Sequence, residues 1–307
     1  MTVSVYLPLV LGIVLALGAP VLVRTLPPPV AVWSLTCAAV ASAVAWTVSL
    51  GIIASTGVER TSVVAHLVNY SETYWRHVDP VAVPSAIAAG FVFLVCVGLF
   101  GRAVVQELAS ARGIRRMADG FCGPSGVVFV DDETPLAYAV GGRRPRIVVS
   151  SGLMRSLGAG ERRAVLAHEA AHLRRRHHVH LRVLRLAAAV HPVLRPAVRA
   201  GVLAVERWAD EEAARSLGDR TLVARSLLRA ALAGNGASAP AGVLAHSTSG
   251  DVSRRVAALL AAPPRPRWSV AAVSAIMVVA AILSPVYSAD HLDTLLSAGS
   301  TASASQS

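Results

Sequence analysis

Four long apolar runs that carry no charged residue constrain this chain more than any other feature. They cover residues 6–23, 30–53, 81–100 and 268–287. Each is close to the roughly 20 residues that an α-helix needs to cross a bilayer. Apolar residues make up 54% of the chain, above the usual range for soluble domains. The sequence therefore predicts a mainly α-helical membrane protein with four transmembrane helices.

The first apolar run also has the length of a cleaved signal peptide. Signal peptides begin with positive charge. Here no positive residue precedes the run, and Arg24 follows it. This reversed pattern favours a retained span.

The distribution of arginine predicts the orientation and the domain boundaries. Residues 101–267 hold 26 of the 29 arginines against 13 acidic residues, a net charge of +13. Arginine-rich loops stay on the cytoplasmic side of a membrane. We therefore expect a multi-pass plasma-membrane protein with three transmembrane helices in 1–100 and a cytoplasmic domain in 101–267. A fourth helix follows in 268–287, then a short disordered tail in 288–307, with both termini extracellular.

So basic a loop also suggests nucleic-acid binding. However, no zinc finger and no aromatic-interleaved basic patch accompanies the arginines. Membrane insertion and attraction to anionic lipid explain the charge without a nucleic acid. We expect membrane lipid as a partner and no direct contact with nucleic acid.

The predicted cytoplasmic domain contains short β-like runs before a helical region. A basic helical stalk over 103–117 leads to runs at 127–130, 136–140 and 147–150. The last two flank Gly141 and Gly142, which predicts a hairpin with a glycine turn. The edge of this small sheet could pair with an extended peptide or serve packing alone. Further on, the apolar stretch 183–205 is interrupted by arginines and prolines, which favours an interfacial helix over a span.

A histidine pair on the next predicted helix has the spacing of a metal site. His168 and His172 are four residues apart on a helix that begins near residue 160, so their side chains share one face. Two such imidazoles can bind one tetrahedral zinc ion. Glu169 can take a proton from a water molecule that zinc activates and pass it to a leaving amine. The next histidines, His177, His178 and His180, are expected to lie on a solvated or lipid-facing surface.

A third zinc ligand is expected from an acidic helix that reaches Glu206, 34 residues after His172. Glu206 and Asp210 share a helical face, so Glu206 can bind zinc while Asp210 accepts a hydrogen bond from a ligand histidine. Glu211 or Glu212 could replace Glu206 as the ligand. His246 or Arg255 could stabilise an oxyanion, or they could be plain basic residues beside the membrane.

The HExxH helix and the following ExxxD helix resemble those of the membrane gluzincins, which include HtpX-type proteases and CAAX prenyl proteases. The closest resemblance is to the BlaR/MecR-type antirepressor peptidases. In that family three spans precede a cytoplasmic zinc domain and one follows it, and segment 137–153 resembles the family's segment before the zinc helix. The resemblance implies a zincin-like α+β domain with a small sheet. It also implies one zinc ion held by His168, His172 and Glu206, with Glu169 as the base.

One departure from that family is clear. Only twenty residues follow the fourth run, and the chain has no lysine for the Ser-x-x-Lys motif of a penicillin-sensor domain. The sequence thus predicts an integral membrane zinc metalloendopeptidase that cleaves a cytoplasmic or membrane-proximal protein. By resemblance, a transcriptional repressor in a signalling pathway is the target. The alternatives are an HtpX-like quality-control protease and a non-catalytic zinc-binding receptor or scaffold, against which the intact Glu169 argues. Substrate, stimulus and oligomeric state are not predicted.

Overall fold

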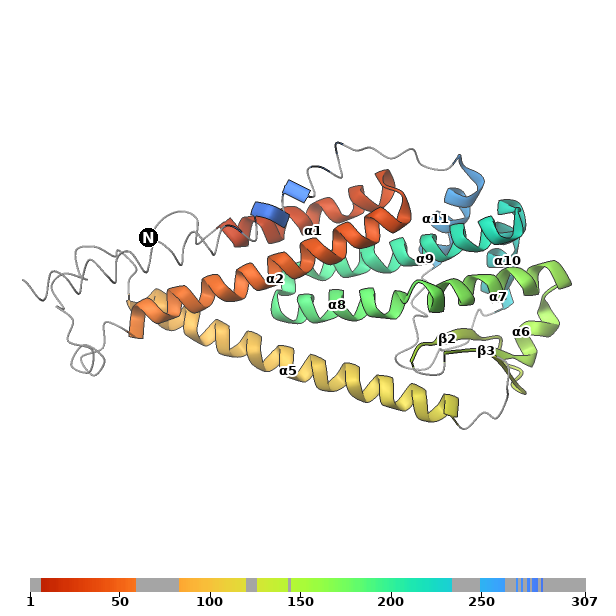
Figure 1. Ribbon diagram of the computed structural model, residues 1–307, viewed down its shortest axis with the longest axis horizontal. Coiled ribbons are helices and arrows are strands. Elements are labelled where there is room, and N and C mark those ends of the chain that lie inside the picture. Colours follow the sequence, from red (N-terminus) through yellow and green to blue (C-terminus); the bar gives the residue numbers. More distant parts are fainter. Residues whose placement is uncertain are drawn as a thin grey trace, which may run out of the picture.

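The computed structural model describes residues 7–58, 83–119, 126–142, 145–233 and 249–262, with single residues between 269 and 283. In these residues the chain is mostly helical and contains one three-stranded sheet. Long helices lie side by side over most of the length of the molecule, and the sheet lies with shorter helices at one end (Figure 1). The expectation of a mainly helical protein with a small sheet is confirmed.

Three long apolar helices correspond to the first three predicted spans. They are α1 (Leu7–Thr25), α2 (Pro28–Val58) and α5 (Val83–Asp119). Within the described residues two stretches are long and apolar enough to cross a membrane, Pro28–Ser55 and Pro84–Ile114, and α1 adds a shorter one. The predicted helical stalk is confirmed, because it continues the third apolar run within α5. Most of the fourth apolar run and all of the tail lie outside the described residues.

Residues 177–217 form a helical hairpin that packs against these long helices. α8 (His177–Val190) and α9 (Arg195–Leu217) are joined by a 3-10 turn, Pro192–Leu194. Figure 1 shows both helices lying along α1 and α2. They share one apolar core with α1 and α2, in which Leu181 and Leu184 are fully buried. Residues 183–205 are therefore not the single helix that the sequence predicts, because they belong to two helices and the turn between them.

The position of the polar residues explains this correction. Arg195 and Arg199 are exposed on the outside of the hairpin, and Arg185 binds Glu107 of α5 at 3.2 Å. Pro192 cannot continue α8 and instead begins the turn. Residues that interrupt an apolar run in the sequence can thus gather on one face of a helix and leave the other face apolar.

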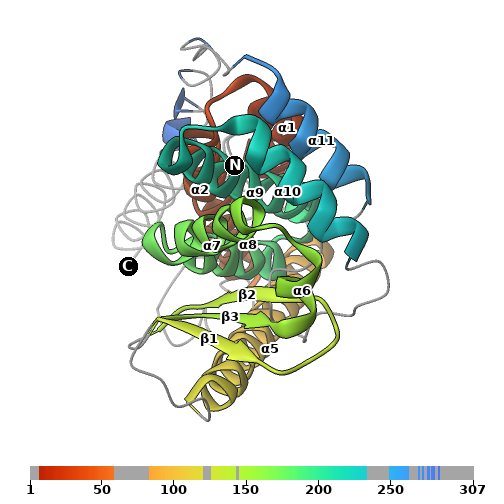
Figure 2. The same ribbon diagram turned by 90° about the vertical axis from the view of Figure 1, so that its right-hand side faces the viewer.

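The sheet joins β1 (Val127–Val130), β2 (Ala137–Val140) and β3 (Arg146–Ser150) in the order β1-β3-β2. β3 pairs in parallel with β1 and antiparallel with β2, where Ala139 lies opposite Ile147. The predicted hairpin is confirmed, and Gly142 adopts a positive φ of 150° in its turn. Because β3 is central, β2 pairs with no second strand in the described part of the chain, and Figure 2 shows it as the strand nearest α7.

α7 (Ala159–Arg174) lies between the sheet and α9, with α6 (Ser151–Ser156) before it. Its first turn contains Glu161, as predicted, where a negative charge suits the helix dipole. The Glu161 carboxylate accepts a hydrogen bond from the Gly158 backbone at 2.9 Å. It also binds Arg225 and Arg229 of α10 (Arg220–Ala233). α11 (Ser249–Leu260) packs against α10 and α9, which completes the end of the molecule that contains the site.

Candidate metal centre

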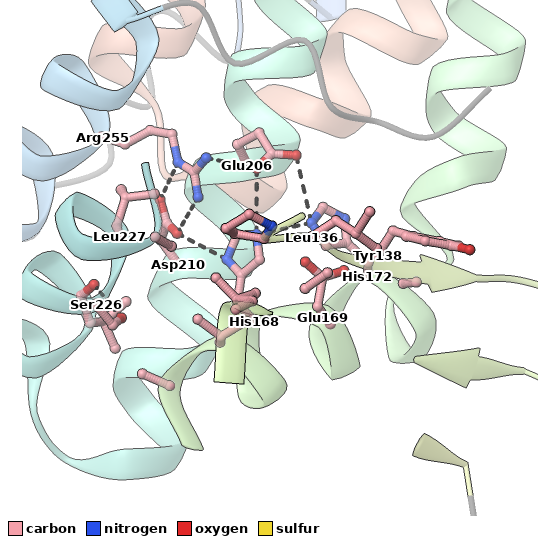
Figure 3. A pocket seen from close by; sticks show the side chains of 18 residues that line it. Leu136, Tyr138, His168, Glu169, His172, Glu206, Asp210, Ser226, Leu227 and Arg255 are labelled. Atoms are coloured by element: carbon pink, nitrogen blue, oxygen red, sulfur yellow. Dashed lines mark hydrogen bonds and ion pairs between the residues drawn. The ribbon is translucent and has the colours of Figure 1, made fainter. Parts of the chain in front are cut away.

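The histidines of α7 point into a pocket beside β2. The Nε2 atoms of His168 and His172 lie 3.1 Å apart, because one helical turn separates the two residues. The His172 side chain is 6% exposed and the His168 side chain 14% exposed, so both are largely removed from water. Figure 3 shows the two rings side by side with Glu169 next to them.

α9 brings a carboxylate to the same point. Glu206 Oε2 lies 3.4 Å from His168 Nε2, and Glu206 Oε1 lies 3.6 Å from His172 Nε2. One ligand atom from each of these three residues falls within 4.8 Å of the others. Two imidazoles and one carboxylate are the donor set of a catalytic zinc site with an open position. The residues at this position therefore fit a zinc ion.

Asp210 holds the outer side of His168. Its Oδ1 atom lies 3.0 Å from His168 Nδ1, on the side of the ring away from Glu206. Burial alone would lower the pKa of His168, but the hydrogen bonds to Asp210 and Glu206 outweigh it and raise that pKa to about 10. The two carboxylates therefore favour positive charge at this ring.

Arg255 of α11 is part of this cluster and does not lie on a membrane-facing surface. It is 4% exposed, donates to both carboxylate oxygens of Asp210 at 2.7 and 2.8 Å, and lies 2.9 Å from Glu206 Oε2. Despite burial, which opposes ionisation, Arg255 lowers the pKa of Asp210 to about 2 and that of Glu206 still further. The alternative reading, a plain basic residue beside the membrane, is therefore wrong for Arg255. His246 lies outside the described residues.

The two alternative ligands point elsewhere. Glu211 binds Arg220 at 2.9 Å, and Glu212 binds Arg175 and Arg215, each at 3.0 Å. Neither belongs to the group of residues whose ligand atoms converge. Of the three glutamates considered as the third zinc ligand, only Glu206 has its carboxylate beside the Nε2 atoms of the histidines.

The histidines that follow His172 do not lie on the solvated or lipid-facing surface that the sequence predicts. His177 is fully buried, and its Nδ1 atom lies 3.1 Å from Nδ1 of His172. His180 is 7% exposed, and its Nδ1 atom lies 3.3 Å from the Thr36 hydroxyl of α2. His178 is partly buried. The left-handed backbone of Arg176, with φ of 51°, ends α7 and turns α8 so that this face points inward. Nothing in the local sequence indicates that turn, so the contact could not be predicted.

Glu169 has the setting of a proton acceptor. Burial raises its pKa to about 7, although His168 and a backbone hydrogen bond from Ala139 of β2 act in the opposite direction. A carboxylate that titrates near neutral pH can both take up and release a proton under physiological conditions. It faces a pocket of about 220 Å³ that also contains the ligand candidates. The other lining residues are mainly apolar and come from β2, the segment just before it, α6, α7 and α10: Leu136, Ala137, Tyr138, Leu153, Val165, Val223 and Leu227 among them.

Comparison with known proteins agrees with this site. Residues 102–202 match the sequence model of peptidase family M48. The matched stretch is about a third of the chain; it includes His168, Glu169 and His172 and ends before Glu206. Comparison with curated proteins and with solved structures gives no match. The family match supports a metallopeptidase and the broader resemblance to membrane gluzincins, and it gives no support to the BlaR/MecR-type group in particular.

Proposed function

We propose that this chain is an integral membrane zinc metalloendopeptidase. The convergence of His168, His172 and Glu206 within 4.8 Å, from two helices far apart in the sequence, carries the proposal. Bound zinc would supply the Lewis acidity that polarises a peptide carbonyl and activates a water molecule. The family match over residues 102–202 supports the same class of activity.

Glu169 is the general base in this proposal. It follows a ligand histidine directly on α7 and lines the same pocket, so it reaches a water molecule there without occupying the cluster of ligand atoms. Its carboxylate takes the proton that water releases and later donates it to the departing amine. Arg255 lines the same pocket, and three of its contacts hold Asp210 and Glu206, so we assign it a positioning role in preference to an oxyanion role.

The outer edge of β2, which no other described strand covers, is the proposed binding place for the substrate backbone. Residues 135–139 line the pocket beside the histidines, and Glu169 already accepts a backbone hydrogen bond from Ala139. An extended peptide can add to such an edge as a further strand, which fixes its backbone and leaves side chains to alternate pockets. The bond to be cut would then lie over Glu169 and the ligand cluster.

The first test of the proposal is zinc binding by protein purified in detergent. Native protein should contain about one zinc ion per chain. Glu206→Ala should weaken binding by more than the roughly 10–100-fold that loss of an outer partner costs. The matched control is Glu212→Ala, which removes a carboxylate bound to arginines outside the cluster and should leave zinc content unchanged. Full zinc content in Glu206→Ala would remove the third ligand from the account.

The substrate is the finer part of the proposal. A catalytic domain on the cytoplasmic side would cleave a cytoplasmic or membrane-proximal protein, and the resemblance noted in the sequence implies a transcriptional repressor. Comparative proteomics of cells carrying native protein or Glu169→Ala tests this. One cleaved regulatory protein would support the repressor, whereas many cleaved membrane proteins would support HtpX-like quality control. No difference between the two cell lines would contradict peptidase activity.

A further inference from the structure

Each ligand histidine of the proposed site has a buried partner on its outer nitrogen. Nδ1 of His168 faces Asp210 at 3.0 Å, and Nδ1 of His172 faces Nδ1 of His177 at 3.1 Å. The Nε2 atoms of both ligand histidines face Glu206. Asp210 has the role that outer carboxylates usually take at zinc sites. His177 occupies the equivalent place on the other ligand.

The protons of the two rings follow from this geometry. If the lone pair on Nε2 of His172 points at the metal, its ring proton must be on Nδ1. Nδ1 of His172 is then the donor, and Nδ1 of His177 is the acceptor. To accept this hydrogen bond, Nδ1 of His177 must carry no proton, so the His177 ring is neutral in this arrangement. Its own proton is therefore on Nε2, the one tautomer that can accept from His172.

The packing around His177 fixes that orientation. The ring is fully buried and lies 4.9 Å from the Trp208 ring of α9. Its Nε2 atom is buried and has no hydrogen-bond partner among the described residues. A buried donor without a partner costs stability. The His177 ring thus makes a hydrogen bond to His172, while its Nε2 atom has no partner among the described residues. A residue that keeps one buried nitrogen unsatisfied is expected to serve the contact that its other nitrogen makes.

We propose that His177 is a positioning residue for the metal centre, in which it accepts a hydrogen bond from His172 and fixes the ring orientation and tautomer of that ligand. This inference rests on the proposed function, because it requires His172 to bind zinc. It adds α8 to the helices that support the site, beside α7 with the HExxH residues and α9 with the ExxxD residues. It also explains why a histidine five residues after His172 is buried within an otherwise basic stretch of sequence.

A matched pair of variants isolates the hydrogen bond from the packing. Asparagine places an oxygen close to the position of Nδ1 of histidine. Leucine has nearly the same shape as asparagine but carries no hydrogen-bond acceptor. Zinc affinity is measured by competition with a chromophoric chelator in detergent. His177→Leu should bind zinc roughly 10–100-fold more weakly than native protein. His177→Asn should stay close to the native affinity, since its side chain can still accept from His172.

The outcomes separate this inference from the proposed function. Equal zinc affinity for the leucine and asparagine variants would overturn the inference. If both are weakened, His177 acts through packing alone, and if both are native, His177 makes no contribution to zinc binding. Native protein that binds no zinc would instead overturn the proposed function. Thermal unfolding with chelator present checks that each variant is folded. If His177→Leu does not fold, His177→Phe replaces it, because phenylalanine keeps an aromatic ring against Trp208 and lacks the acceptor.

Discussion

At the scale of residues, the site is a buried network in which each charged group is held by an ion pair or hydrogen bond to its neighbour. Arg255 holds Asp210 and Glu206, Asp210 holds His168, and Glu206 faces both histidines. A buried ion pair is costly to break, because the partner that remains is a charge without compensation. This arrangement keeps two carboxylates ionised in a setting where burial alone would favour their neutral forms.

Replacement of Arg255 by methionine tests this network of charges. Arg255→Met should lower the free energy of unfolding by roughly 3–5 kcal/mol, the usual cost of breaking a buried ion pair. The loss should be smaller when zinc is present, because the cation would compensate part of the buried negative charge that Arg255 leaves behind. Thermal unfolding in detergent, with zinc and with chelator, measures both values. Arg254→Met is the control, since its side chain is 62% exposed. Equal stability of the two variants would contradict the arrangement.

Residue spacing predicted part of this site and missed the rest for a definite reason. His168, Glu169, His172, Glu206 and Asp210 were found because fixed helical spacing places them on shared faces. The burial of Arg255 and His177 depends on how α11 and α8 pack, and such long-range contacts leave no local pattern. An arginine or histidine in a basic stretch has the same sequence signal whether it is solvated or buried.

At the scale of elements, the helical hairpin of α8 and α9 supports the site. α9 carries Glu206 and Asp210, and the apolar part of the hairpin is packed against α1 and α2. The strands, the glycine turn and the HExxH helix followed from local sequence patterns and are confirmed. The hairpin was missed because 183–205 was read as one segment, whereas Pro192 divides it and its arginines fall on the outer side.

Two glycines of α1 offer a matched test of how closely α1 approaches the hairpin. A Cβ atom at Gly12 would overlap the buried ring of His191, whereas one at Gly18 would have no atom within 4 Å. Gly12→Ala should therefore destabilise the protein by roughly 1–3 kcal/mol through overpacking. Gly18→Ala should have no such cost and should gain up to about 1 kcal/mol from the lower entropy of the unfolded chain. Thermal unfolding in detergent compares them, and equal melting temperatures would contradict the packing of His191 against α1.

At the scale of the whole molecule, one apolar core joins the long helices to the segment that carries the site. α1, α2, α8 and α9 contribute to it together, so the two regions are packed against each other and do not form separate units. His180 of α8 lies beside Thr36 of α2, only three residues after His177, which contacts a proposed zinc ligand. The proposed catalytic centre is therefore tied closely to a helix long enough to cross a membrane.

The charge distribution predicts on which side of the membrane the site lies. Residues 101–267 carry nearly all of the arginine, so a reporter fused after Met117 should indicate the cytoplasm. A reporter fused after Ser288 should indicate the outside. Paired fusions of an alkaline phosphatase and a fluorescent protein at both positions give opposite signals for opposite sides. An outside signal at Met117 would reverse the proposed orientation and exclude cytoplasmic substrates.

Replacement of Glu169 by glutamine tests the proposed peptidase most directly. Glutamine keeps the size of the side chain and most of its hydrogen bonding and removes only the basic oxygen. Zinc content should stay at about one ion per chain, while cleavage of a substrate identified by proteomics, or of the chain itself, should fall by roughly two to four orders of magnitude. A zinc-binding scaffold would show no such separation. A Glu169→Gln protein that binds zinc and cleaves at the native rate would contradict the account.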